Sequence, residues 1–231
     1  TSAPPTTAAA SSTTATTGAV TTAGSTTTTA PSDEHPAWPV SWQALWPADG
    51  STAAVRALAV EGAVDSTITI DYGLEWDGGI WDRIGIGSRE EGQLGAAFYL
   101  QRPEPWVVIL WGAETRSPWI YMTERFDPPL RLDLRGLADG PVVGETTVVV
   151  GDADGVLDEG AYTLTLSLVG FEDLTVMAGE FTGTAHLHLV AEEPGGYVAE
   201  TDIWIAADQA LVRLAPAHIF DSLELAAPWS R

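Results

Sequence analysis

Two histidines, His186 and His188, lie two positions apart in the stretch FTGTAHLHLVAEEPGGYVAETDIWIA. Alternate positions of a strand face the same side, so both imidazoles would share one face. A hairpin with a short Pro-Gly-Gly loop would set His188 opposite Asp202 on that face and Leu187 opposite Ile203 on the other. The pattern therefore predicts a half-buried hairpin with the two histidines on its wetter side.

A pair of strand histidines can bind a metal, and Asp202 would be an acidic neighbour. Zinc would still need a third and usually a fourth ligand, and the other two histidines, His35 and His218, lie too far along the chain to be assigned. A row of Thr, His and Asp is also typical of an ordinary solvent-facing ladder. We favour the ladder and keep a metal site at His186, His188 and Asp202 as the alternative.

The acidic segment GDADGVLDEG is a better candidate for binding a cation. Asp152, Asp154 and Asp158 have spacings like the middle of an Asp-rich calcium loop, in which glycine permits the sharp turn. Both end positions of such a loop lack a carboxylate here, so Glu159 would have to compensate. Asp and Gly also dominate plain hairpin loops. We expect that no cofactor is required, and we keep a structural calcium ion at these residues as an option.

The segment DYGLEWDGGIWD places Trp76 and Trp81 among the carboxylates of Glu75, Asp77 and Asp82. Indole rings beside carboxylates can bind sugars, and two carboxylates at the right separation can hydrolyse them. The sequence cannot supply that separation, and it contains neither a Gly-x-Ser-x-Gly elbow nor a His-Glu-x-x-His motif. We expect that the protein is not an enzyme and that Trp76 and Trp81 are candidate ligand-binding residues.

The elements that must position these residues are strands. In STITIDYGLEW, apolar and polar residues alternate, and the apolar face holds Ile68, Ile70, Tyr72, Leu74 and Trp76. Similar short runs recur along the chain and are separated by Gly and Pro turns. The pattern predicts a mainly β protein with an antiparallel curved sheet, sandwich or open barrel of about ten strands.

Two segments before these strands are open to more than one interpretation. STAAVRALAVEGAV is predicted as a helix with Ser51 as its N-cap and Gly62 just past its end, and a strand is the alternative. Trp38, Trp42 and Trp46 recur at a spacing of four and could form a strip on which sugars stack. We favour the interpretation that they close one end of the core, because tryptophan is generally well buried.

The N-terminal tract differs from the rest of the chain. Residues 1–32 consist of Thr, Ser, Ala, Pro and Gly, with Val20 as the only larger apolar residue and no charge. Such a tract cannot bury enough apolar surface to offset its ordering entropy, so we expect a disordered or extended stalk or linker. Residues 33–231 would then form a single antiparallel β domain, long enough to bury one sizeable core.

Composition limits the partners. The 32 acidic and 10 basic residues give a net charge of −22, which disfavours binding to nucleic acid and to anionic lipid headgroups. The chain has no cysteine and no apolar run long enough to span a membrane. A stalk at the start, without an initial Met, is typical of a mature exported chain. We therefore expect a secreted or cell-surface protein, which could be anchored through a lipidated residue absent from this chain.

Three stretches together resemble a known kind of domain: RFDPPLRLDL, VGFEDLTVMAGEFTGTAHLHL and ETDIWIAADQALVRL. Their order and spacing are similar to those of uncharacterised bacterial envelope lipoprotein domains, in which an ED-x-T-V-P-A-G-T-F turn precedes an aromatic W-x-A strand. Met177 stands where that turn usually has Pro, and Ala210 begins a segment that lacks the usual Gly. The likeness covers about residues 120–215.

More distantly, the chain looks like the curved antiparallel sheet of Lol-type lipoprotein carriers and of mycobacterial lipid-binding lipoproteins. The resemblance implies such a sheet and, as an option, an apolar cargo on its concave face. It implies no catalytic residue.

These observations lead to one functional prediction with two alternatives. We expect a non-catalytic surface or envelope protein that is a structural or accessory subunit of an assembly. Its Thr-rich tract would pair as an extended strand with the sheet edge of another protein chain, because threonine favours strands. The alternatives are a carrier for a lipid or other apolar ligand and, from the ten tryptophans and the linker, a carbohydrate-binding module.

Overall fold

The structure is a computed structural model that describes residues 47, 49–59, 62–76, 78–87, 95–117, 121–206, 209–216 and 222–230. The chain divides into two units, Thr1–Glu34 and His35–Arg231, and all described residues belong to the second. Several residues singled out above lie outside the described ranges: the predicted stalk, His35, Trp38, Trp42, Trp46, Asp77 and His218.

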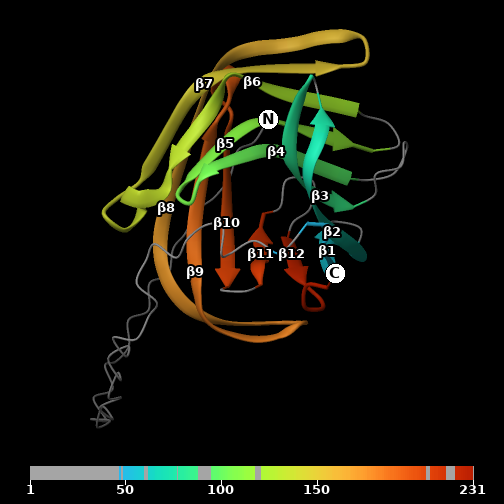
Figure 1. The fold of residues 1–231 in the computed structure, drawn as a ribbon, viewed down its shortest axis with the longest axis vertical. Helices are drawn as coiled ribbons and strands as arrows, with labels where there is room; N and C mark the ends of the chain where they lie inside the picture. Colours follow the sequence, from blue (N-terminus) through green and yellow to red (C-terminus); the bar gives the residue numbers. More distant parts are fainter. Residues whose placement is uncertain are drawn as a thin grey trace, which may run out of the picture. The chain divides into compact units, whose positions relative to one another are not determined.

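The described strands form one closed antiparallel barrel of twelve strands (Figure 1). They are β1 Thr52–Ala59, β2 Gly62–Trp76, β3 Gly79–Gly87, β4 Gly95–Glu104, β5 Val107–Arg116, β6 Tyr121–Asp133, β7 Val142–Asp152, β8 Gly155–Val176, β9 Gly179–Glu192, β10 Val198–Ala206, β11 Ala210–Ala215 and β12 Ser222–Leu225. Two short 3-10 helices, η2 Leu134–Ala138 and η3 Pro194–Gly196, join β6 to β7 and β9 to β10. In these ranges, no helix has the length and apolar character that crossing a membrane requires.

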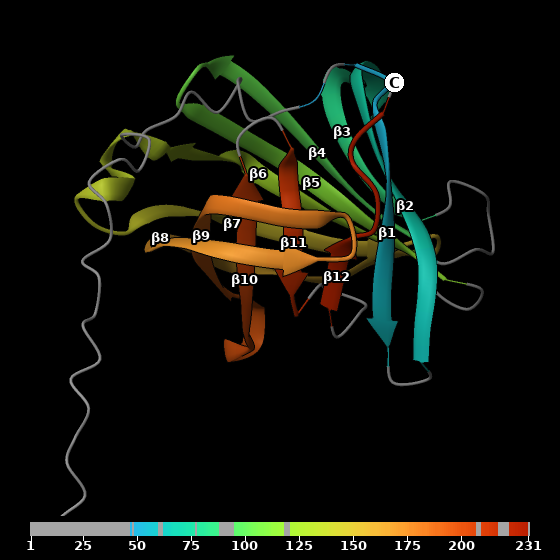
Figure 2. The same cartoon turned by 90° about the horizontal axis from the view of Figure 1, so that it is seen from below.

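The mainly β, antiparallel prediction is confirmed, whereas the strand count and the open or layered architecture were wrong. Closure depends on β1, which pairs with β2 on one side and with β12 on the other (Figure 2). The segment after Ser51, which the sequence left open between a helix and a strand, is this strand. Ala53, Val55 and Ala57 are buried on one face, a period of two that the high helix propensity of alanine obscured.

The apolar face of the strands is the inside of the barrel. Leu100 of β4, Leu187 of β9 and Ile205 of β10 belong to one buried cluster, although β4 is separated from β9 and β10 around the wall. Strands that do not pair can share a cluster only across the interior. A second inner cluster, which includes Val55 and Leu223, gathers side chains around the closing strands. Alternation then places the polar residues of the same strands on the outer face.

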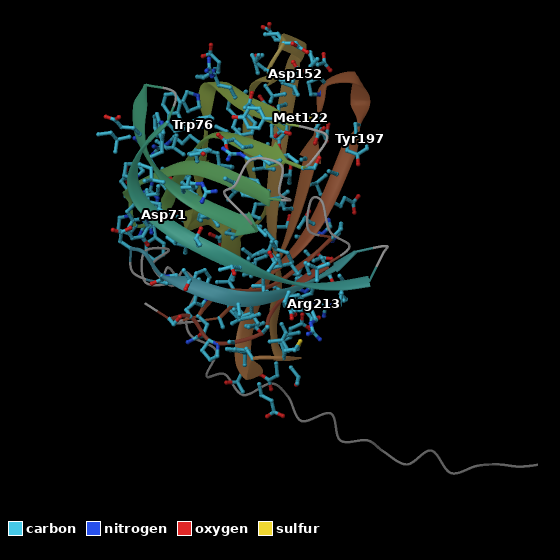
Figure 3. The ribbon with its side chains drawn as sticks, turned by 90° about the vertical axis from the view of Figure 1, so that its right-hand side faces the viewer. Asp71, Trp76, Met122, Asp152, Tyr197 and Arg213 are labelled. Carbon is cyan, nitrogen blue, oxygen red and sulfur yellow. The ribbon has the colours of Figure 1, made fainter. Side chains whose placement is uncertain are left out.

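Strand β8 is longer than the stretch over which it pairs with either neighbour, β7 or β9. It pairs with β7 over residues 155–166 and with β9 over residues 163–176. Its first part, 155–162, therefore has a described strand partner on the β7 side alone. This part rises in the β7–β8 hairpin, whose tip carries the labelled Asp152 in Figure 3.

Candidate functional site

The histidine hairpin has the predicted register. His188 pairs with Asp202 and Leu187 pairs with Ile203 across β9 and β10. The Leu187 side chain is buried in the inner cluster, whereas the His188 side chain is one-third exposed on the outer face. Both the pairing and the choice of faces are therefore confirmed.

The two imidazoles hold a carboxylate between them. One oxygen of Asp202 lies 3.2 Å from Nε2 of His186 and 2.9 Å from Nδ1 of His188. Burial would raise the pKa of Asp202, but the hydrogen bonds with both imidazoles lower it below its ordinary value. Within the described ranges, no group of three or more His, Asp or Glu is placed to hold a metal ion. Asp202 thus bridges the two imidazoles across β9 and β10, and a metal site there stays a prediction.

The same row continues across the outer wall towards the closing strands. The His186 ring stacks on Trp204, with 4.4 Å between ring centroids. On the same indole, the guanidinium of Arg213 lies 5.0 Å from the ring centroid. Arg213 pairs with Glu224 of β12, Glu224 pairs with Arg56 of β1, and the Arg56 guanidinium lies 2.9 Å from Asp65 of β2. Such pairs contribute about 0.2–1 kcal/mol each, so we interpret the row as a stabiliser of the barrel seam.

The acidic loop forms a tight turn. One carboxylate oxygen of Asp152 accepts hydrogen bonds from the backbone N–H of Asp154, at 2.8 Å, and of Gly155, at 3.1 Å. The Asp158 carboxylate accepts from the N–H of Glu159 at 2.8 Å. These carboxylates are used by the local backbone and do not form a metal-binding group in the described part of the chain. The bonds of Asp152 and Asp158 are those of a plain hairpin turn, and calcium binding by this loop stays a prediction.

Trp76 and Trp81 do come together, on the outer face of β2 and β3. The indole N–H of Trp81 donates to the backbone oxygen of Trp76 at 2.8 Å. The Trp76 ring stacks on Tyr99, with centroids 4.0 Å apart, and the Trp81 ring lies against Trp111, at 4.1 Å. Trp81 is only 7% exposed. Both indoles are therefore packed against other rings of the protein and do not form an open platform.

A carboxylate that the sequence did not single out lies in this cluster. Glu114 of β5 is 4% exposed, and its oxygens accept hydrogen bonds from the Trp76 indole at 2.8 Å, the Arg116 guanidinium at 2.6 Å and the Tyr121 hydroxyl at 3.4 Å. Burial and the charge of Glu114 raise the pKa of Tyr99 to about 12. The sequence signal was a charged residue directly after the apolar run VVILWGA.

Of the other carboxylates that the sequence placed near the tryptophans, Glu75 and Asp82 lie within the described residues. Asp82 follows Trp81 on β3, so alternation turns it to the opposite face. There its carboxylate binds the guanidinium of Arg102 at 2.7 Å. Glu75 is exposed on β2. Alternation thus turns Glu75 and Asp82 away from the face of the two indoles, and a ligand site at Trp76 and Trp81 stays a prediction.

A groove of about 470 Å³ lies between the first part of β8 and the η3 turn. Its lining residues are Asp158, Glu159, Gly160, Ala161, Thr163, Glu192, Glu193, Pro194, Gly195, Gly196 and Val198. A Cβ added at Gly160 would lie 2.9 Å from Cβ of Pro194, so glycine lets the turn pack closely on the strand. This volume is within the range of sites that hold ligands.

Apolar side chains flank the groove on both sides. Val156 and Leu157 precede its β8 wall and are 67% and 58% exposed. Tyr197 and Val198 follow the η3 turn and are 63% and 50% exposed. Figure 3 places Tyr197 near the end of the barrel from which the β7–β8 hairpin rises. An acidic groove with apolar borders is thus a surface feature that the sequence did not predict.

Comparison with known proteins adds little to this geometry. No protein-family model and no curated protein matches the chain. Among solved structures, it is similar to the crystal structure of a protein described as a "putative lipoprotein" from Parabacteroides distasonis, at 9% identity and a TM-score of 0.37, over 79% of this chain and 97% of that one. A likeness at that score supports no functional inference. The resemblance to lipoprotein carriers stays a prediction.

Proposed function

We propose that the protein is a non-catalytic accessory subunit of an assembly at the cell surface and that it holds an extended segment of a partner protein along the edge of β8. The observation that carries this proposal is the one-sided pairing of residues 155–162, beside the groove. The composition of residues 1–32 supports a location outside the cytoplasm, because such tracts are typical of stalks on exported proteins.

An unpaired strand edge is a template for another strand. Its N–H and C=O groups point sideways and can form main-chain hydrogen bonds with an extended peptide. Closure removes such edges from the middle of a barrel wall, but β8 extends beyond the end of β9 at the rim. The exposed side chains of Val156, Leu157, Tyr197 and Val198 add apolar surface on both sides, as is common at interaction sites.

The two alternative functions receive less support from the same geometry. A carrier would need room for an apolar ligand, whereas the inner faces of the described strands pack into two hydrophobic clusters. A carbohydrate module would need exposed rings, whereas Trp76 is stacked on Tyr99 and Trp81 is packed against Trp111 at a tilted angle. The Glu114 carboxylate is fully engaged by protein donors, which supports a structural rather than a catalytic role for it.

Site-specific photo-crosslinking tests the proposal. A photoreactive phenylalanine analogue replaces Ala161, which is exposed beside the groove, in the full chain expressed in its own cells. The matched control carries the analogue at Leu58 of β1, which is 42% exposed and has a strand partner on each side, Ala63 and Ser222. Mass spectrometry then identifies the cross-linked segment, and a synthetic peptide of that segment is titrated into the purified chain.

The proposal predicts a defined adduct from position 161 and none from position 58, where β1 is paired on both sides. The matching peptide should bind the purified chain and protect backbone amides of residues 156–162 from hydrogen exchange, because added strands bind through the main chain. A peptide that binds without protecting these amides, or equal labelling from both positions, would overturn it.

A further inference from the structure

We infer that the segment held along β8 carries lysine or arginine side chains, which pair with the carboxylates of the groove. The inference rests on the proposed function and adds the chemistry of the partner. A partner from the same assembly would thus be recognised by its shape, as an extended strand, and by its positive charge.

The lining of the groove is acidic on both walls. Asp158 and Glu159 lie on β8, Glu192 and Glu193 lie before the η3 turn, and no residue of the lining is basic. Asp158 and Glu159 are adjacent on a strand, so their side chains point to opposite faces. A strand added alongside would place its own side chains about 4.5–5.5 Å from the residues opposite. Each face of the added strand would therefore meet a carboxylate.

Two carboxyl groups, Glu193 of the groove and Glu124 of β6, have raised pKa values. Burial raises the pKa of Glu193, and burial together with the charge of Glu193 raises the pKa of the inward-facing Glu124. A raised carboxyl pKa means that the charged form is disfavoured where it stands. A cationic side chain from outside would favour that form, so binding a basic segment would relieve a cost present in the free protein.

Charge also argues against a second copy of the chain as the occupant. Residues 1–32 carry no charge and would leave the groove carboxylates unpaired. Two copies, each with a net charge of −22, would repel one another. A basic partner would instead be steered towards the groove, and its association would weaken as salt screens the attraction.

Two labelled peptides of equal length test the inference by fluorescence anisotropy with the full chain. One is the basic peptide TRVRTRVT and the other its neutral counterpart TQVQTQVT. We expect the basic peptide to bind at least about tenfold more tightly at low salt and the difference to shrink as salt is added. Glu159→Gln and Glu192→Gln should each weaken its binding by roughly twofold to fivefold. Glu180→Gln, exposed on β9 outside the groove, should leave it unchanged.

The outcomes separate the inference from the proposed function. If both peptides bind equally and protect the β8 amides, the inference of a basic partner is overturned, whereas the proposal that a strand adds to β8 is not. If a peptide spanning residues 11–32 binds more tightly than the basic peptide, the inference is overturned and the occupant is a second copy of this chain. If neither peptide binds and position 161 gives no cross-link, both the inference and the proposed function fail.

Discussion

Replacing Glu114 should destabilise the barrel more than replacing any exposed acid. The Glu114 side chain is 4% exposed, and its partner Arg116 is 30% exposed. Removing one member of a buried ion pair costs about 3–5 kcal/mol, because the other charge is left uncompensated. Arg116 can turn partly towards water, which favours the lower end of that range. The lost hydrogen bond from the Trp76 indole adds about 1 kcal/mol.

We therefore expect Glu114→Ala to lower the free energy of unfolding by about 3–4 kcal/mol. For a domain of this size, each kcal/mol corresponds to roughly 2–4 °C of melting temperature. Glu114→Gln keeps an acceptor for Trp76 but loses the charge. We expect it to lower the free energy of unfolding by about half as much as Glu114→Ala does. Glu180→Ala is the control, because an exposed substitution should change stability by less than about 0.5 kcal/mol.

Urea unfolding followed by tryptophan fluorescence measures these differences, since three indoles belong to the cluster itself, those of Trp76, Trp81 and Trp111. The m-value should be unchanged, because the same surface is exposed on unfolding. A loss below about 1 kcal/mol for Glu114→Ala, at an unchanged m-value, would refute the view that this carboxylate holds the outer face of β2–β6 together.

Three further predictions concern titration and metal binding. Because the folded protein holds the proton of Glu124 more tightly than the unfolded chain, stability should fall as the pH rises through its raised pKa. Glu124→Gln should then raise the melting temperature at pH 7, and an unchanged or lower value in thermal scans would contradict this. The pKa of Asp202 is lowered, so its contribution is present above the ordinary carboxyl pKa and is lost as the pH falls through the lowered value. Asp202→Asn should thus cost less than about 1 kcal/mol near pH 6 by urea unfolding, and a cost that persists below that pKa would contradict the assignment. Excess calcium should leave the melting temperature unchanged, because Asp152 bonds its own turn; a rise would instead support a calcium site.

The hairpin of β9 and β10 was predictable because everything it needs is local. Both strands alternate clearly, and the short loop at 194–196 fixes the register, since a slip of one residue would invert both faces. The strand β1 was not predictable in the same way. Its Ala-rich sequence has high helix propensity, and only pairing with β2 and β12 selects the extended form.

Closure and the site geometry depend on contacts that periodicity does not encode. Val55 pairs with Leu225, near the other end of the chain, and the pattern of a strand reveals its faces but not its partner. Glu114 reaches Trp76 across 38 positions for the same reason. The groove arises because the pairing of β9 with β8 stops at Thr163, whereas β8 itself begins at Gly155. The sequence of either strand alone does not show where their pairing stops.

Hydrogen exchange along residues 156–162 of β8 tests the central claim most directly. In an antiparallel pair, successive residues direct their N–H groups to alternate sides. In the free protein, amides directed to β7 should therefore exchange slowly, and those directed to the open edge should exchange fast. Adding the basic peptide should slow the fast set and leave the slow set unchanged. Uniform protection of the whole segment in the free protein, or no slowing of the fast set when the peptide is bound, would contradict the account.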